Sequence, residues 1–269
     1  MRRVGPFVTS MLLERPDGSV VGFSAWHHRK GHGLLMPRST GDAQPIGWWA
    51  PDRRGWWIAV LFMMGSALFA IGSFGPTAAL LGAQAAPVFF AGSIFFTAAA
   101  YLQWFEATNE GDDIEGRGRT GRLFGHRVHS IGWWAASVQL IGTLWFNVTT
   151  FAGMLDLSTR QAEALVWVPD AFGSLAFLTA SGLALLEVSD GVIGWRPRTW
   201  EARIGVSNMI GSIAFGVAAV TSFILPSTGD LVNAWATNAF TFIGAAMFFI
   251  GAAMLIPDLP PEVEPRSGG

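Results

Sequence analysis

The chain has 269 residues, of which 51% are apolar and only 13% are charged, about half the charged share of an ordinary soluble protein. This composition excludes a soluble globular protein, and the net charge of −2 conceals a strong segregation of sign along the chain. Because the chain contains no cysteine, disulfides, thiolate metal sites and iron–sulfur clusters are excluded.

The N-terminal residues 1–55 are polar and are expected to lie outside the bilayer as a cytoplasmic segment. Phe7 to Glu14 and Val20 to Phe23 are typical of two short strands. Between them, Pro16-Asp17-Gly18-Ser19 suits the tight turn of a β-hairpin, because glycine accepts positive φ. A basic segment with three histidines follows, from His27 to His32.

Six long apolar stretches follow this segment. We place them at 56–73, 87–106, 133–153, 170–188, 204–225 and 235–256. Each is long enough to cross a hydrocarbon core of about 30 Å, which takes about 20 helical residues. Backbone amides find no solvent in lipid, so helices are the expected form. The predicted fold class is all-α: a polytopic membrane protein with six transmembrane helices and, because the first stretch starts only near Trp56, no cleavable signal peptide.

The basic residues gather in alternate loops, which predicts the orientation. They precede the first stretch or lie in the loops after the second and fourth: Arg53, Arg54, Arg117, Arg119, Arg122, Arg127, Arg196, Arg198 and Arg203. The opposite loops contain only Arg160. The positive-inside rule therefore predicts a multi-pass protein of the cell (inner or plasma) membrane with both termini in the cytoplasm.

A five-residue motif, glycine, a small residue, two free positions and phenylalanine, recurs once in each stretch. Its first and last residues are Gly65 and Phe69, Gly92 and Phe96, Gly142 and Phe146, Gly173 and Phe177, Gly211 and Phe215, and Gly244 and Phe248. The surrounding sequence repeats with a period of two stretches. This predicts three parallel two-helix repeats, at 56–108, 133–190 and 191–258, with a cytoplasmic Gly/Arg loop at 109–132 and a disordered C-terminal tail at 259–269.

The same motif predicts how the helices pack. At about 1.5 Å per residue, the phenylalanines lie about 18 Å from the inner end in odd stretches and about 15 Å in even ones. We therefore expect all six rings in one layer near mid-bilayer, with the glycines allowing close backbone contact.

Several short motifs resemble the YrhK-like domain, a two-helix membrane module of bacterial proteins. They are Pro16-Asp17-Gly18-Ser19, His28-Arg29-Lys30-Gly31, Arg53-Arg54-Gly55-Trp56-Trp57, Pro169-Asp170 before Gly173-Ser174, and Trp195-Arg196-Pro197-Arg198. The whole chain is similar to larger actinobacterial-type membrane proteins that carry this domain. The third repeat departs from the pattern, since it lacks a tryptophan pair and ends in Asp258. The resemblance implies a membrane location and no catalytic residues.

No ionisable residue falls near the middle of a stretch, which argues against a proton-coupled pump. Glu106, Glu187 and Asp258 end the even stretches, where we expect interfacial acids exposed to water beside loop arginines; a coupling-ion site is the alternative. Asp170 begins its stretch, where an acid suits a helix N-terminus.

Three of the uncharged polar residues inside the stretches are singled out: Gln139, Asn147 and Asn208. They are interpreted as interhelical hydrogen-bonding groups, or alternatively as the lining of a polar path. The five histidines, His27, His28, His32, His126 and His129, are all outside the stretches, which excludes axial haem ligands within the bundle. They are expected to face water or phospholipid, with a metal site as the weaker alternative.

The sequence leaves three function classes open. The first is a non-enzymatic structural or accessory membrane component, and the second is a small-solute transporter or channel with a polar path between repeats. The third is a lipid-modifying enzyme using inner-face residues such as Glu106, Glu187, His126 and His129. No enzyme motif, cofactor site or nucleic-acid partner is indicated. The expected partners are membrane lipid and either further copies of the chain or the other subunits of a membrane complex.

Overall fold

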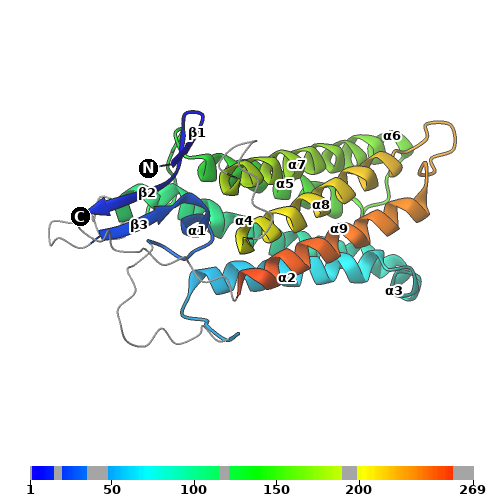
Figure 1. The fold of residues 1–269 in the computed structure, drawn as a ribbon. Coiled ribbons are helices and arrows are strands. Elements are labelled where there is room, and N and C mark those ends of the chain that lie inside the picture. Colours follow the sequence, from blue (N-terminus) through cyan, green and yellow to red (C-terminus); the bar gives the residue numbers. More distant parts are fainter. Residues whose placement is uncertain (1, 15–19, 35–47, 115–120, 190–198, 257–269) are drawn as a thin grey trace.

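Six long helices form a closed ring in the computed structural model, which describes residues 2–14, 20–34, 48–114, 121–189 and 199–256. They are α2 (Arg54–Ser73), α4 (Ala85–Ile114), α5 (Ile131–Ala152), α7 (Val168–Val188), α8 (Trp200–Thr221) and α9 (Ala234–Leu255). Each packs against the long helix before and after it in the chain, and α9 closes the ring against α2 (Figure 1).

Among the described residues, five helical segments are long and apolar enough to cross a membrane. They are Arg54–Ser73, Gly75–Glu110, Thr159–Val188, Trp200–Thr221 and Ala234–Leu255. The chain is thus mostly helical and membrane-embedded, as its composition indicates. The remaining long helix, α5, has the same length of 22 residues as α8 and α9, and it contains Gln139, Asn147 and three tryptophans.

Side-chain caps explain where several of these helices begin. Ser130 precedes α5, and its hydroxyl accepts a hydrogen bond from the Trp133 amide. Thr199 before α8 and Asn233 before α9 accept in the same way from the amides of Ala202 and Ala236. Each cap satisfies an amide that the first helical turn leaves without a backbone partner.

Two helices extend beyond the predicted stretches. The α4 helix continues to Ile114, so the first part of the predicted 109–132 loop is helical. It is held there by Asn109, whose side chain donates to the Phe105 carbonyl oxygen and exchanges two hydrogen bonds with the backbone of Arg122. Such side-chain bonds extend order beyond what the apolar pattern alone predicts.

The fourth apolar stretch is also preceded by helix. Its helix begins at α6 (Thr159–Ala162), behind a capping box of Ser158 and Gln161, and passes through a π-helical segment (Glu163–Trp167) into α7. The π turn lies just before Pro169, which has no amide hydrogen to donate to a preceding turn. The α-helix of the predicted 170–188 stretch thus begins at Val168, but helical structure already runs from Thr159. A π segment of this kind often marks a functional site.

The N-terminal segment forms a small antiparallel sheet in the order β1-β2-β3, with β1 (Arg2–Val4), β2 (Phe7–Glu14) and β3 (Val20–Ser24). Glu14 pairs with Val20 at the closed end of the β2–β3 hairpin, whose turn at Pro16-Asp17-Gly18-Ser19 is outside the described residues. The strands lead directly into α1 (Ala25–Arg29). This sheet is the part of the fold that an all-α description leaves out.

The bundle has two distinct ends. The sheet, α1 and the C-terminal end of α9 lie at one end, which we call the sheet end (Figure 1). The short helix α3 (Gly75–Leu81), the 3-10 turn Gly82–Gln84 and α6 lie at the other, which we call the far end.

Candidate functional site

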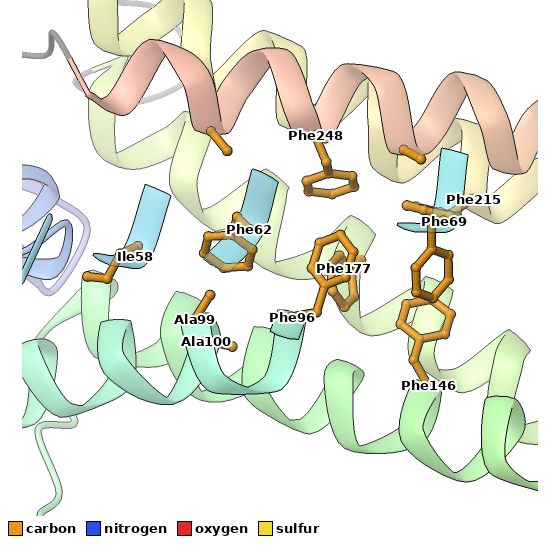
Figure 2. Close-up of a cluster of buried hydrophobic side chains, with 12 residues drawn as sticks. Ile58, Phe62, Phe69, Phe96, Ala99, Ala100, Phe146, Phe177, Phe215 and Phe248 are labelled. Atoms are coloured by element: carbon orange, nitrogen blue, oxygen red, sulfur yellow. The ribbon is translucent and has the colours of Figure 1, made fainter. Parts of the chain in front are cut away.

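Six phenylalanines, one from each long helix, fill the middle of the bundle, and we call them the phenylalanine core. They are Phe69, Phe96, Phe146, Phe177, Phe215 and Phe248, all buried in one cluster (Figure 2). Phe69, Phe146 and Phe215 contact one another, with ring centroids 6.4, 6.0 and 5.8 Å apart. Phe96, Phe177 and Phe248 form a second triangle, at 6.2, 6.1 and 5.5 Å.

Three further contacts join the two triangles. Each links a helix to the next long helix in the chain: Phe69 with Phe96 at 5.6 Å, Phe146 with Phe177 at 5.2 Å, and Phe215 with Phe248 at 5.7 Å. All these separations lie in the range of favourable ring pairs, each contributing about 0.5–1.5 kcal/mol beyond area burial. The rings therefore form two stacked triangles rather than the single expected layer.

The motif glycines allow this packing. A Cβ on Gly65 would lie 2.8 Å from the Phe96 ring, and one on Gly92 would lie 2.7 Å from the Phe69 ring. The α5–α7 and α8–α9 pairs show the same reciprocal contact through Gly142, Gly173, Gly211 and Gly244. Since real Cβ atoms need more room than this, the aromatic ring of each helix occupies space that only glycine leaves on its partner.

The sheet end is closed by α1, which packs against α4, α5 and α7. Every residue of α1 is buried, together with the following Lys30. The Arg29 guanidinium donates to Glu187 Oε2 of α7 at 2.5 Å, with both side chains almost fully buried. Arg29 and Lys30 also lie over the Trp26 ring, 5.3 and 5.2 Å from its centroid. The basic segment is thus part of the bundle rather than a solvated extension.

The expectation that the acids at the inner helix ends face water is wrong for the two that the structure describes. Glu106 and Glu187 are 1% and 4% exposed. Glu106 accepts from Arg54 at 2.5 Å, and Glu187 accepts from Arg29. The arginine partners were expected from the loops, but they come from the start of α2 and from α1. Asp258 is outside the described residues.

The histidines divide into two groups. His126 and His129 are exposed, whereas His27 and His28 are buried in α1, against the expectation of solvated rings. Glu201 lies 3.5 Å from His27 Nε2, but burial dominates and lowers the pKa of His27 to about 4. Burial and nearby positive groups also lower the pKa of His32 to about 3. Among the described residues, no group of three or more His, Asp or Glu side chains is arranged to hold a metal ion.

The three polar residues of the apolar stretches have different surroundings. Asn147 donates to Thr97 Oγ1 across the α4–α5 interface at 2.9 Å. Gln139 and Asn208 line a small cavity of about 10 Å³ together with Arg29 and Lys30, room for about one water molecule. Gln139 and Asn208 both lie three residues before their motif glycine in the sequence, and in the structure both line this same cavity.

A larger cavity, of about 260 Å³, opens at the far end. Its floor is the triangle Phe69, Phe146 and Phe215. Asp170 is the only charged residue in the part of the lining that the structure describes, and its Oδ2 accepts a hydrogen bond from Ser222 at 3.3 Å. Because the helix containing Asp170 begins at Thr159, this acid lies well inside a helix and does not compensate a helix N-terminus.

Sequence reasoning missed two polar features of this bundle. It assigned Asp170 to a helix start, although its position beside the hydroxyl-rich end of α5 could have suggested a cavity. It also passed over Gln103 of α4, which is fully buried and whose amide atoms bond to no described residue. The signal for Gln103 was an amide within a stretch that has no charged residue before Glu106.

No known protein-family model, curated protein or solved structure matches this chain.

Proposed function

We propose that the chain is a non-enzymatic structural or accessory component of the cell membrane. The observation that carries the proposal is the closed interior of the bundle. Of the two triangles, that of Phe69, Phe146 and Phe215 lines the far-end cavity. Phe177 and Phe248 of the other triangle line the small cavity. The two triangles are in direct ring contact, so a layer of packed aromatic rings separates the two cavities. Such an interior favours a scaffold over a conduit.

The proposal includes six membrane spans built from three two-helix repeats. Support for the sixth span comes from α5, which has the length of α8 and packs between α4 and α7. The repeat is supported by the reciprocal glycine–phenylalanine contact, which occurs in the α2–α4, α5–α7 and α8–α9 pairs. Arg53, Arg54, Arg122, Arg127 and Arg203 adjoin the sheet end of the long helices, which favours a cytoplasmic location for that end.

The similarity to the YrhK-like domain is retained within the proposal on the sequence motifs alone. Of the motifs within the described residues, two lie close together: His28-Arg29-Lys30-Gly31 in the buried end of the N-terminal segment and Arg53-Arg54-Gly55-Trp56-Trp57 at the start of α2. They meet at Gly31 and Gly55, where a Cβ on Gly31 would lie 2.6 Å from the Gly55 nitrogen. A partner in this role is membrane lipid, another copy of the chain or another subunit of a membrane complex.

A flux measurement in liposomes tests the proposal. The purified protein is reconstituted, and permeation of K⁺, Na⁺ and protons is followed for the natural sequence and for Gln139→Leu and Asn208→Leu. The matched control is Thr179→Leu, because Thr179 of α7 is exposed and bonds only within its own helix. We expect no flux above that of empty liposomes, and lower thermal stability in detergent for the two test variants than for the control.

The alternative with direct support is a small-solute transporter, because a cavity with polar residues in its lining lies on each side of the phenylalanine core. Alternating access would require the two ring triangles to separate in turn. The same measurement distinguishes it: flux through the natural protein that Gln139→Leu and Asn208→Leu abolish, with thermal stability retained, would replace the scaffold proposal by this one.

A further inference from the structure

We propose that the far-end cavity is a binding site for a small organic cation of the alkylammonium class. The first ground is the charge of its lining. Asp170 supplies a carboxylate, and none of the cavity residues is basic. Among the described residues, the hydrogen bond that Asp170 accepts comes from the uncharged hydroxyl of Ser222. The carboxylate therefore has no counter-charge within the cavity, and a bound cation would supply one.

The second ground is the direction of the hydrogen bonds around the cavity. The hydroxyls of Thr149, Thr150 and Thr237 donate to backbone carbonyl oxygens of Val166, Phe146 and Asn233. The Trp167 indole likewise donates to the Ala219 carbonyl oxygen at 2.9 Å. With their hydrogens used inside the protein, these hydroxyls present mainly oxygen lone pairs to the cavity. Asn238 also lines the cavity, and its side-chain amide offers both a donor and an acceptor. An anion would find few donors here.

The third ground is the aromatic surface. Phe69, Phe146 and Phe215 form the floor, and Phe89 and Trp167 add two further rings. Aromatic faces around a carboxylate are the surroundings in which alkylated ammonium groups bind, through cation–π attraction as well as charge. A strongly hydrated metal ion would instead need several oxygen ligands converging on one point, and Asp170 is the only carboxylate present.

The size of the cavity limits the ligand. Its volume of about 260 Å³ is just below the usual range for ligand pockets, which starts at roughly 300 Å³. A compact ammonium compound fits this space, either as a free solute or as the headgroup of a lipid at the membrane surface. This inference is independent of the scaffold proposal, because a bound cation needs no path through the phenylalanine core.

Two probes of nearly identical shape test the inference by calorimetry on the purified protein. Choline contains the quaternary ammonium, and 3,3-dimethylbutan-1-ol replaces the charged nitrogen by carbon. We expect choline to bind at least about tenfold more tightly than the neutral alcohol. Asp170→Asn should weaken choline binding by about tenfold or more, whereas Asp156→Asn, which changes an exposed acid outside the cavity lining, should leave it unchanged.

Ala86→Leu provides a second variant, because it fills the cavity without altering its charge. It should abolish choline binding even if Asp170→Asn does not fold. Equal binding of the two probes, no choline binding tighter than about 1 mM, or unchanged choline affinity in Ala86→Leu would each overturn the inference.

The lipid source is distinguished by repeating the choline titration in nanodiscs. Discs of phosphatidylglycerol alone are compared with discs that also contain phosphatidylethanolamine. Weaker choline binding in the second preparation identifies a lipid ammonium headgroup as the competing occupant, and equal binding identifies a free solute. Both results support the site.

Discussion

Replacing Gly92 by alanine tests whether the glycine–phenylalanine contact holds the helices together. The added Cβ would lie 2.7 Å from Phe69 Cδ2 and 3.1 Å from the Gly65 carbonyl oxygen. The first distance is about 0.8 Å shorter than the closest comfortable carbon–carbon contact of about 3.5 Å. The Phe69 ring cannot turn away freely, because Phe96, Phe146 and Phe215 contact it on other sides. The α2 and α4 helices must therefore separate or the rings must repack.

The expected magnitude follows from two opposing terms. Overpacking of this kind costs about 1–3 kcal/mol, and the better helix propensity of alanine returns up to about 1 kcal/mol. Gly182→Ala in α7 is the matched control, since the nearest atom to its Cβ would be Met209 Cε at 3.9 Å. The propensity term is common to both variants, so the free energy of unfolding should be about 1–3 kcal/mol lower for Gly92→Ala than for Gly182→Ala.

Unfolding in mixed detergent–SDS micelles, followed by circular dichroism, measures this difference. If the two variants unfold at the same SDS fraction, the close glycine contact does not determine the stability of the bundle.

Three further predictions concern the polar contacts. Arg29→Met leaves the Glu187 carboxylate buried without its arginine, which should lower the stability of the docked α1 by about 3–5 kcal/mol. Faster hydrogen exchange in residues 20–34 would report this loss. Adding Glu187→Gln to the variant should restore most of the protection. Burial lowers the pKa of His27 to about 4, so His27 is neutral when α1 is docked and binds more protons when α1 is released. Docking of α1 should therefore weaken by up to about 3 kcal/mol as pH falls from about 6.5 to about 4. A hydrogen-exchange rate that does not depend on pH, after correction for intrinsic chemistry, would contradict this, and His27→Phe is the control. Asn147→Leu removes the hydrogen bond to Thr97 and should lower the free energy of unfolding by about 0.6–2 kcal/mol. Thr97→Val should lower it by a similar amount. Fully additive losses in the double variant would show that the two side chains are not coupled.

The helices were predictable from the sequence, because in lipid an apolar run of about 20 residues has few alternatives to a helix. The five apolar segments of the structure each overlap a predicted stretch, and α2 ends at the predicted Ser73. The start of the helix before Pro169 was not predictable in the same way, because the polar capping residues Ser158 and Gln161 extend the helix beyond the apolar pattern.

The surroundings of the polar residues were much less predictable. Glu106 and Glu187 look like surface acids when only their own helices are considered. Their partners come from distant parts of the chain: Glu187 bonds to Arg29 of α1, 158 residues earlier, and Glu106 bonds to Arg54 at the start of α2, 52 residues earlier. Asp170 was misread because its role depends on Phe69, Phe146 and Phe215, which come from three other helices. Local sequence contains little information about such convergence.

The physics of the bilayer explains why the polar groups gather at the two ends. Lipid tails are as apolar as leucine, so burying more apolar surface does not bring helices together there, and close packing and hydrogen bonds must do so. In this bundle the middle of each helix pair is devoted to that packing, through the motif glycines and the phenylalanine core. A charged group in that layer would open a gap between glycine and ring and would also lack water. The charged groups that line cavities therefore lie towards the helix ends, where Asp170 lines one cavity and Arg29 another. If the middle layer sets the spacing of both ends, substitutions in it should alter the two cavities together, and that coupling would make the core part of any binding function as well as of the fold.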